Sequence, residues 1–248
     1  MDTQSIVFVL FAGLLTGIIN SISAAGSLVS LPALMFVGLP IDVANGTNRI
    51  GILALCSSAV VGLKSKSVKH DNYIWWLVLA VIPGAVAGAL LAVNINKEIL
   101  NWVLRVMVLA FILITLFNPV TLLVNSKEVM TTKRKIIATI AFFFIGIYGG
   151  FIQAGTGFFM MLATWLIHKF PLVKTNYFKN FLMMIYTIPA LIVFSLNGMV
   201  DLKYGLILAV GSSIGAWGAS RWSVYANPVW VKRGMLAILI GLFIRLWL

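Results

Sequence analysis

Two basic residues, Arg49 and Lys179, lie several residues inside predicted membrane helices. Ionisable side chains at this depth are costly, so they are functional by default. Each follows short polar residues, and the two positions lie 130 residues apart, one in each half of the chain. Two cations that face one cavity, together with the amino ends of broken helices, would bind an anion. The polar residues that we expect to join them in a substrate site are Asn20, Ser27, Thr47, Asn48, Gln153, Thr156, Asn176 and Asn180.

An alternative interpretation is that both basic side chains snorkel from helix ends towards the membrane interfaces. Their equivalent positions and polar neighbours favour the substrate role, whereas Arg105 has no counterpart in the second half and is interpreted as snorkelling. We do not expect a carboxylate relay of the kind found in many proton pumps. The acidic residues all lie near predicted segment ends and are Asp2, Asp42, Asp71, Glu98, Glu128 and Asp201.

The composition places these residues in a membrane protein. Hydrophobic residues make up 61% of the 248 residues, charged residues only 10%, and the mean hydropathy is +1.06. Such a chain has too little polar surface for a soluble globule, which makes it a polytopic membrane protein. The net charge of +12 comes from basic residues in short loops between apolar runs, so it reflects membrane topology and not a nucleic-acid partner. The single cysteine, Cys56, excludes an internal disulfide.

Eight apolar segments meet the length of about 20 residues that a membrane span requires. Two of them, 5–37 and 134–169, are too long for one straight helix and are interrupted at 24–27 and 153–157. We expect each to fold as a hairpin or re-entrant pair, with one broken span as the alternative. Interrupted helix is tolerated in a membrane only where it is buried in protein or lines a wet cavity. The other segments are predicted as single helices at 43–63, 73–93, 98–124, 176–196, 203–222 and 229–247.

The order of small and basic residues recurs after about 130 positions, which predicts two membrane repeats, 1–125 and 126–248, of about four segments each. If the long segments are hairpins, most lysines and arginines of short loops fall on one side, which is then cytoplasmic. The halves start on opposite faces, as in the inverted repeats of many secondary transporters. Glycines four residues apart predict close helix packing, and these pairs are Gly13 and Gly17, Gly84 and Gly88, Gly146 and Gly150, and Gly211 and Gly215.

Short motifs in both halves resemble the TauE/SafE family of sulfite exporters. In the first half they are Gly17-Ile-Ile-Asn20, Leu31-Pro32, Gly38-Leu-Pro40 and Gly46-Thr-Asn-Arg49. In the second half they are Tyr148-Gly-Gly150, Gly155-Thr-Gly157 and Asn197-Gly198-Met-Val-Asp201. The resemblance covers nearly the whole chain and implies transport of sulfite or small organosulfonates, commonly outward.

These observations together predict an all-α helix bundle in the cytoplasmic membrane that works as a secondary transporter of small anions. An anion channel of the same architecture is the alternative, as is another substrate such as a carboxylate or sulfate. An enzyme would need clustered His, Asp, Glu or Cys residues at bilayer depth, and the sequence has none. We therefore expect no catalytic residue, metal or cofactor. The sequence leaves the oligomeric state open.

Overall fold

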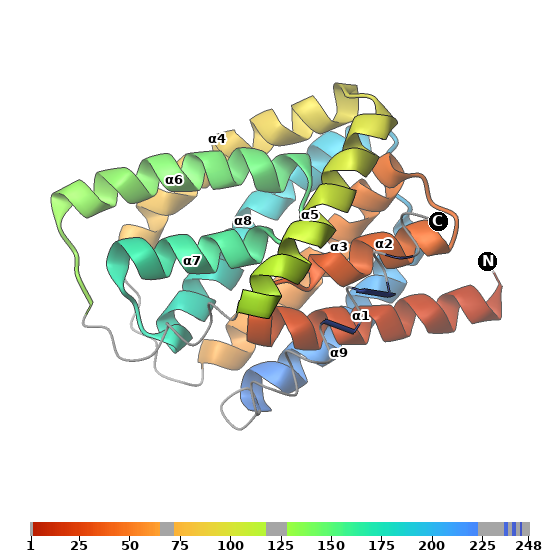
Figure 1. The fold of residues 1–248 in the computed structure, drawn as a ribbon, viewed down its shortest axis with the longest axis horizontal. Helices are drawn as coiled ribbons and strands as arrows, with labels where there is room; N and C mark the ends of the chain where they lie inside the picture. The colour runs from red at the N-terminus through yellow and green to blue at the C-terminus, as the bar shows by residue number, and fades with distance from the viewer. Residues whose placement is uncertain are drawn as a thin grey trace.

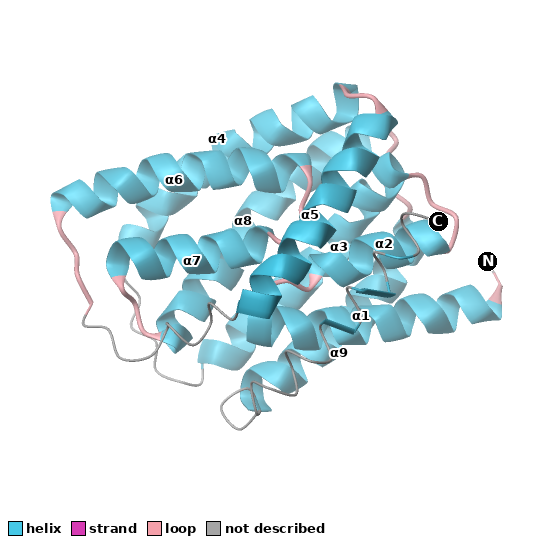
Figure 2. Cartoon of the chain, viewed as in Figure 1, coloured by secondary structure: helices cyan, strands magenta, loops and turns pink. Residues whose placement is uncertain are grey.

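The computed structural model describes residues 2–64, 72–117 and 128–222, together with residues 236, 237, 240, 241 and 244. The described part is helical and contains no β-strand, as Figures 1 and 2 show. This confirms the predicted all-α bundle. The helices are α1 (Thr3–Ser23), α2 (Ser27–Phe36), α3 (Ile41–Lys64), α4 (Tyr73–Asn94), α5 (Lys97–Phe117), α6 (Thr132–Phe151), α7 (Thr156–His168), α8 (Leu172–Leu196) and α9 (Leu202–Trp222).

Six of these helices are long and apolar enough to cross a membrane, namely α1, α3, α4, α5, α6 and α8. Helix α9 has a similar length, 21 residues, but several of them are glycine or serine. Large apolar side chains such as Leu79, Phe144 and Leu206 are at least 60% exposed, as expected of surfaces that face lipid. The chain is therefore a multi-pass membrane protein. Most of the predicted span 229–247 lies outside the described residues.

Both long apolar segments are broken close to the predicted positions. Helix α1 ends before Ala24, whose backbone is left-handed with φ 60°, and α7 begins after Gly155, with φ 73°. Helix α7 then runs back along α6 (Figure 1). The rings of Tyr148 and Phe159 are 5.2 Å apart beside the break, and Arg134 at the start of α6 donates a hydrogen bond to the Ile167 carbonyl near the end of α7. Helix α2 turns back along α1 in the same way (Figure 1). The hairpin prediction is confirmed, and the single broken span is not observed.

Glycines bring the two halves of the chain into backbone contact. Helix α1 packs on α9, and α6 packs on α4, so each half contributes one helix to both pairs. A Cβ atom at Gly17 would lie 2.3 Å from the Ser212 carbonyl oxygen, and one at Gly150 would lie 2.0 Å from that of Ala85. The predicted glycine pairs therefore do permit close approach. The division into repeats 1–125 and 126–248, and their inverted relation, stay predictions.

Basic residues gather at one end of the described bundle. The Tyr73 hydroxyl at the start of α4 donates a hydrogen bond of 3.4 Å to the Lys135 carbonyl, and Lys174 forms a 2.5 Å ion pair with Glu128. The starts of α4, α6 and α8 therefore meet, as the hairpin topology predicted. At the opposite end Lys97 pairs with Asp42 at 2.9 Å. The loop residues Lys66, Lys69, Lys127, Lys232 and Arg233 lie outside the described residues.

Candidate functional site

Arg49 projects from α3 into the protein interior and is fully buried. Its Nη1 donates to the Gly149 carbonyl at 3.2 Å and its Nη2 to the Gly150 carbonyl at 2.5 Å. Its guanidinium also lies 4.4 Å from the centre of the Phe194 ring. The last carbonyls of an α-helix have no partner within the helix and carry partial negative charge. Arg49 therefore caps the carboxyl end of α6, and it does not snorkel to a membrane surface.

Lys179 makes the matching contact from α8. It is fully buried, and its Nζ donates to the carbonyl of Asn20 in the last turn of α1 at 2.7 Å. Arg49 and Lys179 are 130 residues apart, and so are their acceptors Asn20 and Gly150. Each half thus supplies a cation that stabilises the end of a broken helix in the other half.

Two asparagines repeat this exchange beside the cations. The Asn45 side chain of α3 donates to the Phe151 carbonyl of α6 at 2.7 Å. The Asn176 side chain of α8 donates to the Ser21 carbonyl of α1 at 2.9 Å. Two side chains therefore satisfy carbonyls at the end of each broken helix, as a helix end buried away from water requires.

The two helix breaks contact each other directly. The Ser27 hydroxyl donates to the Gln153 carbonyl at 2.8 Å and accepts from the Gly155 N–H at 3.1 Å. The Thr156 hydroxyl donates to the same Gln153 carbonyl at 3.2 Å. The amino ends of α2 and α7 therefore meet in the interior, where their positive dipole ends favour negative charge.

The amide side chains named from the sequence surround this junction. Asn20 donates from Nδ2 to Asn180 at 3.3 Å, and Gln153 donates from Nε2 to the Thr187 hydroxyl at 2.8 Å. Asn48 accepts a 2.5 Å hydrogen bond from Ser30 of α2. All of these amides are buried, whereas Asn176 is half-buried.

Thr47 contacts a different segment of the chain. Its hydroxyl accepts a 2.8 Å hydrogen bond from the N–H of Asp201, just before α9. Thr47 and Asn48 are neighbours in sequence, but an α-helix turns by about 100° per residue, so the two side chains point in different directions. The structure thus places the Thr47 hydroxyl against the start of α9.

Tyr186 also lies in this region, although it is not among the site residues predicted from the sequence. It is fully buried on α8, seven residues after Lys179, and its hydroxyl lies beside the side chains of Gln153 and Thr156. A spacing of seven residues returns to the same face of a helix. That spacing from Lys179 is the signal that could have identified it.

The cluster contains two cations and no described carboxylate. The described acidic residues are exposed or lie at helix ends, and these are Asp2, Asp42, Glu98, Glu128 and Asp201. Within the same described ranges, no three His, Cys, Asp or Glu side chains are grouped to hold a metal ion. The cluster is therefore suited chemically to a small anion.

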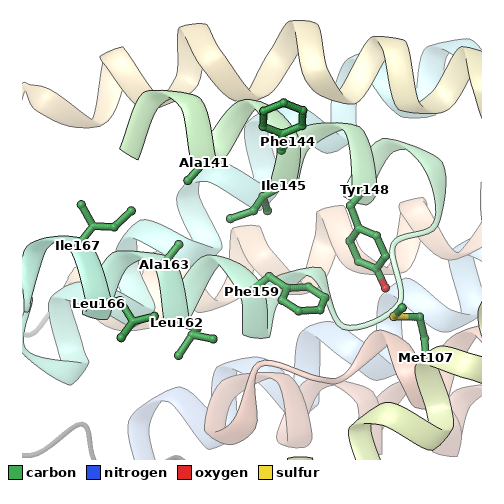
Figure 3. Close-up of a pocket in the computed structure, with 10 residues that line it drawn as sticks. All are labelled: Met107, Ala141, Phe144, Ile145, Tyr148, Phe159, Leu162, Ala163, Leu166 and Ile167. Atoms are coloured by element: carbon green, nitrogen blue, oxygen red, sulfur yellow. The ribbon is translucent and has the colours of Figure 1, made fainter. Parts of the chain in front are cut away.

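An apolar groove between α6 and α7 is a different feature. It holds a volume of about 500 Å³ and is lined by side chains of the two helices and by Met107 of α5 (Figure 3). Its one hydroxyl, that of Tyr148, donates to the Ala154 carbonyl at 2.6 Å. With hydrocarbon walls on both sides, the groove has no chemistry for an anion.

A family model described as sulfite exporter TauE/SafE matches residues 9–246. The chain is 29% identical over 246 residues to a "Probable membrane transporter protein ORF9" of Sinorhizobium sp, covering 97% of this chain and 92% of the relative. It is 28% identical to a "Probable membrane transporter protein" of Haemophilus influenzae, covering 87% and 83%. A third relative, "Probable membrane transporter protein YfcA" of Escherichia coli K12, is 28% identical over 85% and 78%. No solved structure matches the chain.

Proposed function

The chain belongs to the sulfite exporter TauE/SafE family of membrane transporters, and on this premise we propose that it carries a small oxyanion, sulfite or an organosulfonate, out across the cytoplasmic membrane. Arg49, Lys179 and the polar residues at the two helix breaks form the substrate site. We assign Thr47 to the support of α9 and not to this site, because its hydroxyl accepts a hydrogen bond from the segment before α9.

The observation that carries this proposal is the buried junction of two broken helices. Cations from both halves and the amino ends of α2 and α7 surround it, and none of the described acidic residues enters it. Binding sites of secondary transporters commonly form at discontinuous helices, whose amino ends point towards anionic groups. The same chemistry would also accept sulfate or a carboxylate, so the choice of substrate rests on the family.

A carrier accounts for the burial of the site residues better than a channel does. Arg49, Lys179 and Gln153 are all fully buried, so an ion reaches them only after helices move apart. Alternating access supplies such a movement, whereas a conducting pore needs a continuous path. An anion channel of the same architecture remains the second candidate, and single-channel recording distinguishes the two.

The test is uptake of labelled sulfite and sulfoacetate into proteoliposomes. We expect flux with the wild type and its loss in both Arg49→Ala and Lys179→Ala, after circular dichroism and size-exclusion chromatography have checked that the variants are folded. Arg105→Ala is the matched control, because it removes a cation from a membrane helix outside the junction and should keep its flux. If both variants transport like the wild type, the two cations have a structural role only.

A further inference from the structure

Among the residues that the structure describes, none forms a hydrogen bond of normal geometry with the Tyr186 hydroxyl, although Tyr186 is fully buried. A buried polar group normally has such a partner, because the loss of its hydration is not otherwise compensated. The side chains of Gln153 and Thr156 are close enough to interact with the hydroxyl, but neither meets the distance and angle of a formed hydrogen bond. A group left unpaired in this position calls for an explanation.

Two more polar atoms of the junction share this property. Nε of Arg49 and Oε1 of Gln153 are buried and have no hydrogen-bond partner in the described part of the chain. The Nη atoms of Arg49 are already bound to the end of α6, which leaves the Nε–H as a free donor. The Thr187 hydroxyl can donate as well as accept a hydrogen bond. Rotation of the Gln153 amide by half a turn therefore keeps the contact with Thr187 and puts an N–H where Oε1 now lies.

Gly149 brings Arg49 and Tyr186 close to each other. Its carbonyl accepts the hydrogen bond from Nη1 of Arg49. A Cβ atom built on Gly149 would lie only 2.8 Å from the Tyr186 hydroxyl and 2.8 Å from Cγ2 of Thr156. Only a glycine therefore lets the tyrosine hydroxyl reach the end of α6 that Arg49 caps.

We propose that the Tyr186 hydroxyl, Nε–H of Arg49 and the Gln153 carboxamide are the hydrogen-bond donors that recognise the oxyanion head of the substrate. Three donors match the three oxygens of a sulfite or sulfonate group, whereas a planar carboxylate has only two. Tyr186 is then a substrate-binding residue that selects the head group. This inference rests on the proposed function and assigns the atoms that carry it out.

The test uses Tyr186→Phe in the full-length chain, reconstituted in lipid nanodiscs for binding and in proteoliposomes for uptake. Loss of one hydrogen bond to a charged group corresponds to a rise of about 10- to 100-fold in Kd and KM for sulfite and methanesulfonate. The rise for acetate should be smaller. Tyr177→Phe is the control, because it removes a buried hydroxyl from the same helix and should keep both constants within about threefold of the wild type.

The outcomes separate this inference from the proposed function. If the wild type neither binds nor transports any of these anions, the proposed function fails. If the wild type transports them and Tyr186→Phe does so with unchanged Kd and KM, the assignment of Tyr186 is wrong while the proposed function stands. Should Tyr186→Phe not fold, Gln153→Glu tests the same proposed head-group site, because glutamate has nearly the shape of glutamine. Its negative charge should abolish sulfite binding, and binding as in the wild type would overturn the inference.

Discussion

The Lys179 ammonium group donates a 2.7 Å hydrogen bond to the carbonyl of Asn20, 159 residues earlier in the chain. Arg49 makes the counterpart contact with Gly150 across 101 residues in the opposite sense. Each cation therefore compensates the negative end of a helix that the other half of the sequence supplies. Substrate binding and the stability of the breaks depend on the same side chains, so experiments have to separate the two effects.

Replacing each cation by methionine should measure how much each contributes to stability alone. Arg49 makes two carbonyl contacts and stacks on Phe194, whereas Lys179 makes one contact to a carbonyl that also accepts the Ala24 N–H. We expect Arg49→Met to lower the unfolding free energy by about 2 kcal/mol more than Lys179→Met does. Thermal unfolding in one detergent measures the difference. Equal melting temperatures for the two variants would contradict it.

The contact between the two breaks should also be measurable. Ser27→Ala removes the hydrogen bonds to Gln153 and Gly155, and leaves a buried carbonyl and a buried N–H without that partner. We expect a loss of stability of about 1–3 kcal/mol and slower sulfite uptake. Ser57→Ala is the control, because the Ser57 hydroxyl donates to the Leu53 carbonyl of its own helix. If both variants unfold at the same temperature, the contact between the breaks contributes nothing.

Close packing at Gly150 predicts a large effect from a single methyl group. A Cβ atom there would lie 2.0 Å from the Ala85 carbonyl oxygen, which belongs to backbone and cannot move alone. We expect Gly150→Ala to cost at least about 3 kcal/mol and to reduce the yield of folded protein. In the described part of the chain, a Cβ atom at Gly218 meets no atom within 4 Å outside its own helix backbone, so Gly218→Ala should be neutral or slightly stabilising. Fluorescence-detected size-exclusion chromatography compares the two, and a normal yield of Gly150→Ala would count against the packing of α6 on α4.

Thr47 should affect folding and leave substrate affinity unchanged. Thr47→Val keeps the shape of the side chain but removes the acceptor for the Asp201 N–H. We expect a loss of about 1 kcal/mol in stability and a KM for sulfite within twofold of the wild-type value. Uptake kinetics on the folded variant measure this KM. A KM raised tenfold would return Thr47 to the substrate site.

The sequence by itself determined the class of protein, the helices and the positions of their breaks. These features are local, since hydropathy, helix-breaking residues and glycine spacing are properties of neighbouring residues. Arg49 and Lys179 were identified for the same reason, because a charge inside an apolar run is visible without any knowledge of its partner.

Only the tertiary structure decided what these residues contact. That Arg49 caps α6 and Lys179 caps α1 depends on how helices from different halves pack, and no local pattern specifies a partner more than 100 residues away. The same packing turns Thr47 towards α9 and brings Tyr186 beside the breaks. A helix fixes the direction of each side chain, but the neighbour that it meets depends on the arrangement of the whole bundle.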